Sequence, residues 1–162
     1  MKNLQFVTVY LDDLCFGIDV LLIREVNRAL DITPVALAPD FISGVLNLRG
    51  QIITIVDPGV RLGFTPRKIT EKTRCIVLKS NEELSNSIIE TEETLKTSDD
   101  QVAFLFDAMG DLVSVTDDQI EQPPANIKAV ERELIQGVVK RGDQLVIILK
   151  IDELLQLQGT KG

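Results

Sequence analysis

The sequence predicts a mainly β protein in which one chain carries two similar small β subdomains. Three observations support this fold class. Residues 40–57 have the pattern of two extended segments joined by a tight turn, and a related unit returns at residues 135–155. Short apolar segments bounded by turn residues occupy much of the remaining sequence. With 162 residues, 44% of them hydrophobic, the chain is long enough to bury a core.

The first of these units combines signals for a strand, a turn, a second strand and a short helix. Residues 52–56 are nearly all apolar and all β-branched, which is typical of a strand buried on both faces. Gly50 can adopt a positive φ and so can close a tight reversal. Asp57 can cap the helix that Pro58 begins. The unit therefore holds Arg49 at the turn between two strands.

The second unit repeats the first one. Residues 135–138 correspond to 42–45, and the dipeptide Arg141-Gly142 corresponds to Arg49-Gly50. Upstream of both units, apolar residues also match at a constant offset of 95 positions. A duplication with such long spacing usually means two copies of one small fold. The sequence therefore predicts a single domain over residues 1–162. The two copies within it span residues 4–63 and residues 101–157.

The other expected elements follow from apolar runs and turn residues. Asp12-Asp13 separate two apolar runs that form a predicted hairpin, and Pro123-Pro124 interrupt the chain before a weakly helical stretch. Residues 22–27 are compatible with a short strand or a helical turn. We expect strands at 4–11, 14–20, 74–79, 101–107 and 111–115, a turn at 107–110, the weakly helical stretch at 127–136 and a terminal helix at 151–157.

Residues 81–100 form a separate acidic segment. They contain seven acidic residues and one lysine, so the segment carries −6 of the chain's net charge of −8. Its apolar residues are too few to build a core. We expect a solvated, extended, mobile hairpin loop between two strands, with a short helix at about 82–89 as the alternative.

Composition excludes several function classes. The net charge of −8 argues against nucleic acid or an anionic membrane as the main partner. The absence of histidine removes His-based triads and His metal ligands, and neither standard glycine-rich phosphate loop occurs. Cys15 and Cys75 stand alone in apolar segments, as buried free thiols do. We therefore expect a binding module rather than an enzyme, with no catalytic residues, metal site or cofactor.

The sequence also predicts where the protein acts. No apolar run approaches the length of a membrane span, so we expect no direct membrane insertion. Residues 1–4 lack the apolar stretch of a secretory signal. Both features favour a cytoplasmic location.

Two charged residues have both a structural and a functional interpretation. Glu25 can be a solvated edge charge that discourages unwanted strand pairing. Arg49 can be a solvated loop charge, or its guanidinium can be displayed to bind a partner's carboxylate. Periodicity does not distinguish these interpretations.

Taken together, the motifs resemble those of the CheW-like adaptor family of bacterial chemotaxis signalling. The most specific one is the string Gly-Val-Leu-Asn-Leu-Arg-Gly at residues 44–50, in its flanking context. The resemblance extends over nearly the whole chain, about residues 5–155. Its further carriers are residues 16–20, 23–26, 39–43 and 55–57 and the repeat at 135–155.

The resemblance implies both a fold and a function. The fold would be two small five-stranded β-barrels side by side, with short helices. The function would be that of a non-catalytic adaptor that couples transmembrane chemoreceptors to the histidine kinase CheA. One barrel would dock on the regulatory domain of the kinase, and the cytoplasmic tip of a methyl-accepting chemoreceptor would lie against a groove between the barrels. The protein would be recruited from the cytoplasm to membrane receptor arrays.

The resemblance also implies which residues bind the partners. Glu25, Gly44 and Arg49 fall on family positions tied to coupling, and Ile23 falls on a neighbouring apolar contact. The expected site consists of Ile23, Glu25, Gly44, Asn47, Arg49 and Gly50.

Two features depart from the family pattern. Pro58 and Gly59 stand where a leucine and an arginine usually follow the aspartate that ends the strand, which implies different packing of the next helix. The acidic segment 81–100 is longer than the usual tight hairpin, which implies altered partner geometry or an auxiliary adaptor with a special partner.

Two rival functions belong to other classes. A small-molecule-binding or sensor barrel needs an interior cavity with a few converging polar groups, but the strand faces are filled by Val, Ile, Leu and Phe. A hydrolase with paired carboxylates needs two acids at a defined separation. The adjacent pairs Asp12-Asp13 and Asp117-Asp118 are typical of turns instead.

Overall fold

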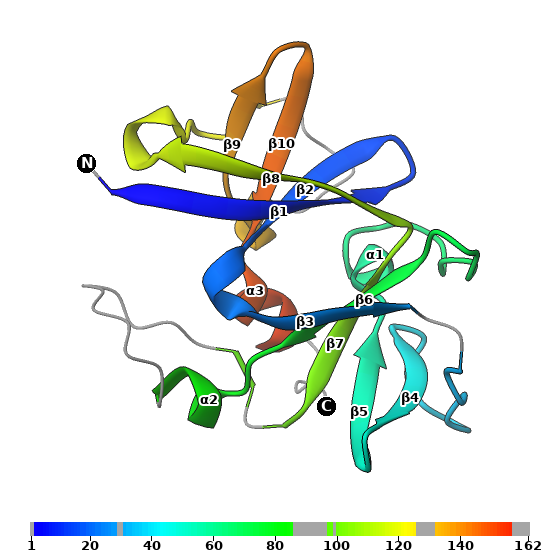
Figure 1. The fold of residues 1–162 in the computed structure, drawn as a ribbon. Helices are drawn as coiled ribbons and strands as arrows, with labels where there is room; N and C mark the ends of the chain where they lie inside the picture. Colours follow the sequence, from blue (N-terminus) through cyan, green and yellow to red (C-terminus); the bar gives the residue numbers. More distant parts are fainter. Residues whose placement is uncertain (1, 29–30, 86–96, 99, 126–131, 157–162) are drawn as a thin grey trace.

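The computed structural model describes residues 2–28, 31–85, 97–98, 100–125 and 132–156, and in this part of the chain ten strands form two five-stranded sheets (Figure 1). The first sheet consists of β1 (Asn3–Leu11), β2 (Leu14–Asp19), β8 (Ala108–Thr116), β9 (Ile135–Arg141) and β10 (Gln144–Leu149). The second consists of β3 (Ile23–Arg28), β4 (Ile42–Leu48), β5 (Gln51–Val56), β6 (Arg74–Leu78) and β7 (Val102–Phe106). The helical segments are η1 (Val20–Leu22), α1 (Pro58–Arg61), α2 (Asn81–Ser85), η2 (Asp117–Gln119), η3 (Arg132–Leu134) and α3 (Ile151–Gln156).

The predicted mainly β class with two five-stranded units is confirmed, whereas closed barrels are not. The strand orders are β8-β1-β2-β10-β9 and β3-β6-β7-β5-β4. Among the described strands, no backbone pairing joins β8 to β9 or β3 to β4. Each unit is therefore an open sheet with two end strands.

The two sheets have the same construction. In each, an antiparallel hairpin (β4–β5 or β9–β10) places its inner strand parallel to a strand of a second hairpin: β5 runs beside β7, and β10 beside β2. By its position in the sheet, β7 is thus the counterpart of β2. The sequence offset of 95 residues instead aligns β7 with β1. The first sheet draws its strands from both ends of the chain, and the second from its middle. The sequence limits of the duplication, 4–63 and 101–157, stay a prediction.

Both sheets contribute to one large core. Its fully buried side chains include Phe16 and Ile18 from the first sheet and Phe104 and Phe106 from the second. Leu154 of α3 packs in the same cluster, which agrees with the place of α3 between the sheets in Figure 1. Burying a side chain of this size stabilises the fold by roughly 1.5–3 kcal/mol. The two sheets are therefore held together by shared apolar packing.

The predicted helix cap at Asp57 is confirmed. Asp57 Oδ1 accepts the N–H of Gly59 at 3.0 Å, and Pro58 is the first residue of α1. Burial raises the pKa of the Asp57 carboxyl, and backbone N–H donation from Arg67 and Gly59 opposes that rise. The terminal helix is confirmed as α3. None of the helices in the described residues is long and apolar enough to span a membrane.

Three sequence predictions are wrong in part. The turn at 107–110 is absent because Ala108 and Met109 already pair with β1, so β8 begins at Ala108. The extended loop expected at 81–100 begins instead with α2, which supports the helical alternative there; residues 86–96 lie outside the described part. At the end of the segment 127–136, η3 and the start of β9 replace the expected helix, and residues 127–131 are not described.

Arg67, in the connection after α1, ties the two sheets together. Its Nη1 lies 2.9 Å from Asp12 Oδ1 and 2.9 Å from Asp107 Oδ2, and its side chain is only 7% exposed. Asp12 lies in the turn between β1 and β2, and Asp107 between β7 and β8. The backbone N–H of Arg67 donates to Asp57 Oδ2 at 2.8 Å. Since charge-assisted hydrogen bonds are strong, this cluster fixes the first hairpin against the second sheet.

Candidate partner-binding site

The tip of the β4–β5 hairpin displays Arg49. Leu48 pairs with Gln51, which leaves Arg49 and Gly50 as a two-residue turn with φ of 52° and 86°. Positive φ at both positions matches the type I′ turn, for which Asn-Gly is preferred. Asn47 Oδ1 accepts the N–H of Gly50 at 3.1 Å and so supports the turn. An arginine with positive φ costs about 1 kcal/mol of backbone strain. The geometry of the turn alone therefore does not explain why an arginine stands at position 49.

The repeated hairpin does not display an arginine in the same way. In β9–β10, Arg141 pairs with Gln144, so the turn residues are Gly142 and Asp143. Arg141 therefore takes the strand position that Leu48 takes in the first hairpin. The predicted equivalence of Arg141-Gly142 with Arg49-Gly50 is wrong by one residue. The strand pattern and the turn geometry set the register of each hairpin, and a shared Arg-Gly dipeptide does not specify it.

Arg49 is paired with Glu25 of β3. Its Nη2 donates to Glu25 Oε2, the same oxygen that accepts from Arg24 Nε and Nη2, both at 3.2 Å. Asn27 Nδ2 donates to the other oxygen, Oε1, at 3.1 Å. β3 is one end strand of its sheet, and Arg49 stands at the tip of the hairpin that contains the other end strand, β4. The ion pair thus connects the two edges of the second sheet.

The charges of this pair are unequally exposed. The Arg49 side chain is 67% exposed, whereas that of Glu25 is 23% exposed. The hydrogen bond from Asn27 holds the pKa of the Glu25 carboxyl below its usual range, with further lowering by Arg49 and Arg24 and with burial acting in the opposite direction. Glu25 is therefore an ionised carboxylate, held by four donor nitrogens from Arg24, Asn27 and Arg49, that orients an exposed guanidinium.

Gly44 has a packing role of its own. A Cβ on Gly44 would lie 2.2 Å from the carbonyl oxygen of Thr33, and its φ is 151°. The backbone of Thr33 exchanges hydrogen bonds of 2.9 and 2.8 Å with Val45 at this point. Gly137 of the repeat is enclosed similarly, because its Cβ would lie 2.5 Å from Ile120 Cγ2. Both glycines allow a crossing segment to approach the hairpin closely.

The six predicted site residues thus fall into two groups. Glu25, Asn47, Arg49 and Gly50 meet at the hairpin tip and its ion pair. Ile23 is half-buried against the core two residues before Glu25, and Gly44 lies toward the other end of β4. Arg24 and Asn27 hold the Glu25 carboxylate, but no pattern in the sequence predicts this role for either residue. The one signal that could have found them is their proximity to Glu25 along the chain.

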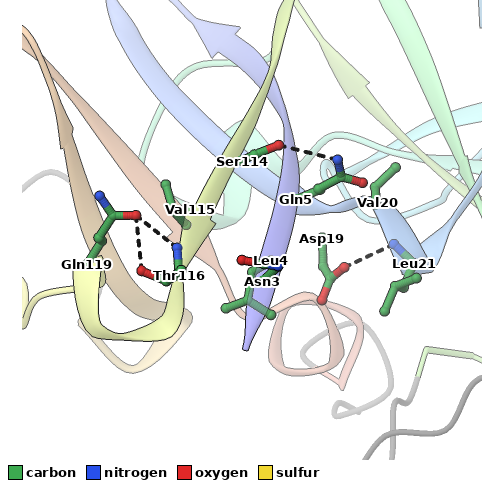
Figure 2. Close-up of a pocket in the computed structure, with 10 residues that line it drawn as sticks. All are labelled: Asn3, Leu4, Gln5, Asp19, Val20, Leu21, Ser114, Val115, Thr116 and Gln119. Atoms are coloured by element: carbon green, nitrogen blue, oxygen red, sulfur yellow. Dashed lines mark hydrogen bonds between the residues drawn. The ribbon is translucent and has the colours of Figure 1, made fainter. Parts of the chain in front are cut away.

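A surface hollow of about 520 Å³ lies beside β1, β8 and η1 (Figure 2). Polar groups on its walls are paired with each other: Gln5 Nε2 donates to Ser114 Oγ at 3.2 Å, and Asp19 Oδ1 accepts the N–H of Leu21 at 2.9 Å. The hollow opens where the first sheet passes into η1, the segment that leads to β3. Figure 2 shows Val20 and Leu21 on this connecting segment.

The remaining reactive groups form no site among the described residues. No group of three or more Cys, Asp or Glu side chains there is arranged to hold a metal ion. Cys15 and Cys75 are both buried free thiols, as predicted. Burial raises the pKa of Cys75 to about 11, so its thiol stays protonated at neutral pH.

Comparison with known proteins identifies the family. A model of the CheW-like domain matches residues 5–159. The chain belongs to the CheW-like family. Similar relatives are chemotaxis proteins CheW of Treponema pallidum, 28% identical over 153 residues (94% of this chain and 82% of the relative), and of Thermotoga maritima, 28% identical over 156 residues (96% and 90%). The crystal structure of scaffolding protein TtCheW from Thermoanaerobacter tengcongensis superposes with a TM-score of 0.76 at 24% identity, covering 95% of this chain and 88% of that one. This last likeness supports the CheW-like fold.

Proposed function

We propose that this chain is a non-catalytic adaptor that couples transmembrane chemoreceptors to the histidine kinase CheA. It belongs to the CheW-like family, and its relatives are named as chemotaxis proteins, one of them as a scaffolding protein. The adaptor acts in the cytoplasm and joins membrane receptor arrays through its partners. Its two partners are the regulatory domain of CheA and the cytoplasmic tip of a methyl-accepting chemoreceptor.

The observation that carries this proposal is the display of Arg49. A two-residue turn prefers Asn or Gly at this position, yet Arg49 occupies it with a φ of 52° and leaves most of its guanidinium in solvent. Glu25 engages one nitrogen, Nη2, and orients the group. The donors that remain can form charge-assisted hydrogen bonds with a partner carboxylate. The pair thus acts as an oriented polar contact rather than as a stabilising salt bridge.

An apolar contact accompanies the polar one. Ile52 of β5 pairs with Asn47 beside the tip, and its side chain is 59% exposed. A desolvated apolar centre supplies most of the affinity in typical interfaces, while neighbouring charges set orientation. We assign Ile52 to the apolar part of the kinase contact and Arg49 to the polar part. Ile23, Gly44 and Gly50 support this surface by holding β3 and the hairpin in place.

We assign the receptor tip to the hollow of Figure 2, which lies where the first sheet leads into η1. Its strand residues all belong to the first sheet, so this assignment departs from the groove between the two units that the resemblance implies. Leu4, Val20 and Val115 give this hollow an apolar part. None of the residues that line it belongs to β3 or to the β4–β5 hairpin, which carry the Glu25–Arg49 pair. An adaptor needs two such separate contacts, one for each partner.

Calorimetric titration with the CheA regulatory domain tests the proposal. Arg49→Glu reverses an exposed charge at the tip and should weaken binding by a few kcal/mol. Arg141→Glu is the matched control, because Arg141 is 45% exposed on the equivalent hairpin but takes a strand position. Wild-type affinity for the control and a large loss for Arg49→Glu support the proposal. Equal affinities for both variants would contradict it, provided that circular dichroism shows both chains folded.

A further inference from the structure

Arg24 lies between the Glu25–Arg49 ion pair and the two ends of segment 81–100. We call these ends and their neighbours the base of the segment: Ser80, Asn81, Glu83, Thr97, Ser98 and Gln101. Its guanidinium makes contacts in two directions. On one side Nε and Nη2 each donate to Glu25 Oε2 at 3.2 Å. On the other side Nη1 donates to Gln101 Oε1 at 2.6 Å and lies 3.9 Å from Glu83 Oε1. The Arg24 side chain is 19% exposed, so these contacts are sheltered from solvent.

The described base of segment 81–100 is a well-bonded structure. Ser80 and Glu83 cap α2 reciprocally: the N–H of Ser80 donates to Glu83 Oε1 at 2.9 Å, and the N–H of Glu83 donates to Ser80 Oγ at 3.3 Å. The two ends of the segment are joined by a bond of 2.8 Å from the N–H of Asn81 to the Ser98 carbonyl. Asn81 Oδ1 also accepts the N–H of Thr97 at 2.8 Å. The base can therefore serve as a fixed support for a neighbouring side chain.

The two ends of this base meet Arg24 through different residues. Glu83 belongs to α2, where the segment begins, and Gln101 follows the segment directly and precedes β7. The backbone of Gln101 is also held in place, because its carbonyl accepts the N–H of Thr54 in β5 at 3.1 Å. A planar guanidinium fork held on one side by such acceptors has little rotational freedom on its other side. The position of Glu25 Oε2, and with it that of Arg49, then depends on the base.

We infer that Arg24 is a positioning residue through which the base of segment 81–100 sets the orientation of the Glu25–Arg49 pair. The inference rests on the proposed function insofar as that pair contacts the kinase. It gives the base of the acidic segment a role in specificity, because the base sets the orientation of the displayed arginine without touching the partner. Arg24 acts through Glu25, because its own nitrogens are turned toward acceptors of the same chain.

The test removes the support and leaves the charges in place. Gln101→Ala deletes the acceptor for Arg24 Nη1 but retains the backbone bond to Thr54. Gln101→Glu keeps an oxygen acceptor at the same position but adds a negative charge, so it should restore the affinity and is not used in the Glu25 titration. Gln5→Ala is the matched control, since it removes a glutamine hydrogen bond in the other sheet. Two quantities are measured: the Glu25 carboxyl titration by carbon-detected NMR, and the affinity for the CheA regulatory domain.

For Gln101→Ala we expect a shifted Glu25 titration and an affinity lower by roughly 3- to 10-fold, as for one lost hydrogen bond. Gln5→Ala should match wild type in both quantities, and Gln101→Glu should match it in affinity. Unchanged Glu25 titration in Gln101→Ala overturns the inference. An equal loss of affinity in Gln101→Ala and Gln101→Glu overturns it too, because Gln101 would then contact the partner itself. The NMR titration needs no partner, so failure of the proposed kinase contact leaves that part of the test valid.

Discussion

Replacing Arg49 by asparagine separates the two possible roles of this residue. If Arg49 is a structural turn residue, its loss destabilises the fold. If it is displayed for a partner, its loss weakens binding only. Asparagine is chosen because it accepts positive φ readily and Asn-Gly is the preferred type I′ pair.

The expected change in stability follows from two opposing contributions. The exposed pair with Glu25 contributes about 0–1 kcal/mol, since the Arg49 side chain is 67% in solvent. Relief of the strain at a φ of 52° raises the free energy of unfolding by about 1 kcal/mol. The net change in the free energy of unfolding is therefore within about 1 kcal/mol of zero, equivalent to a shift of about 2–4 °C in Tm at most.

The expected change in binding is larger. Charge-assisted hydrogen bonds contribute about 1.5–3 kcal/mol each, so loss of one such contact lowers the affinity for the CheA regulatory domain by roughly 10- to 150-fold. Thermal melts measure the first quantity and titration calorimetry the second, with Arg141→Asn as the control for both. A Tm lower by more than about 8 °C, or an affinity equal to that of wild type, would refute this reasoning.

Three further predictions concern stability. Gly44→Ala should cost about 1–3 kcal/mol from the clash with the Thr33 carbonyl and about 1 kcal/mol more from its φ of 151°. Gly50→Ala, whose Cβ would meet nothing within 4 Å, should cost only about 1 kcal/mol, so equal losses in urea denaturation would contradict the close approach at Gly44. Arg67→Met should lower the free energy of unfolding by about 2 kcal/mol and Tm by about 4–8 °C, because Asp12 and Asp107 lose their shared donor; an unchanged melt would show that the cluster does not hold the sheets. Because the folded pKa of Glu25 is lowered, its contribution to stability is complete above the ordinary glutamate pKa and is lost as pH falls through the lowered value. The stability difference between wild type and Glu25→Gln should therefore shrink on acidification. A difference that grows would contradict a lowered pKa for Glu25 in the folded state.

Local features of this fold were predictable from sequence, because they depend on neighbouring residues. The cap at Asp57 and the turn at Gly50 require only a suitable side chain and a suitable φ, and both are confirmed. The assembly of the sheets was not predictable in the same way. It depends on parallel pairing of β10 with β2, which joins residues from opposite ends of the chain. Apolar patterns mark such strands as buried but do not specify their neighbours.

The site shows the same division. Asn47, Arg49 and Gly50 were identified from the resemblance, and the structure places them on one turn beside Glu25. The role of Arg24 was missed because its acceptor, Gln101, lies 77 positions away in sequence. The difference between the two hairpins was missed because a shift of one residue in register is invisible in a short repeated motif.

The most direct test of the central claim is reconstitution of receptor control over the kinase. Membranes that contain a chemoreceptor are combined with CheA, with and without this chain, and kinase autophosphorylation is measured in the presence and absence of the receptor's ligand. We predict that the ligand changes kinase activity only when the chain is present, and that Arg49→Glu abolishes this dependence whereas Arg141→Glu preserves it. A ligand response that is the same with and without the folded chain would contradict the assignment of this protein as the coupling adaptor.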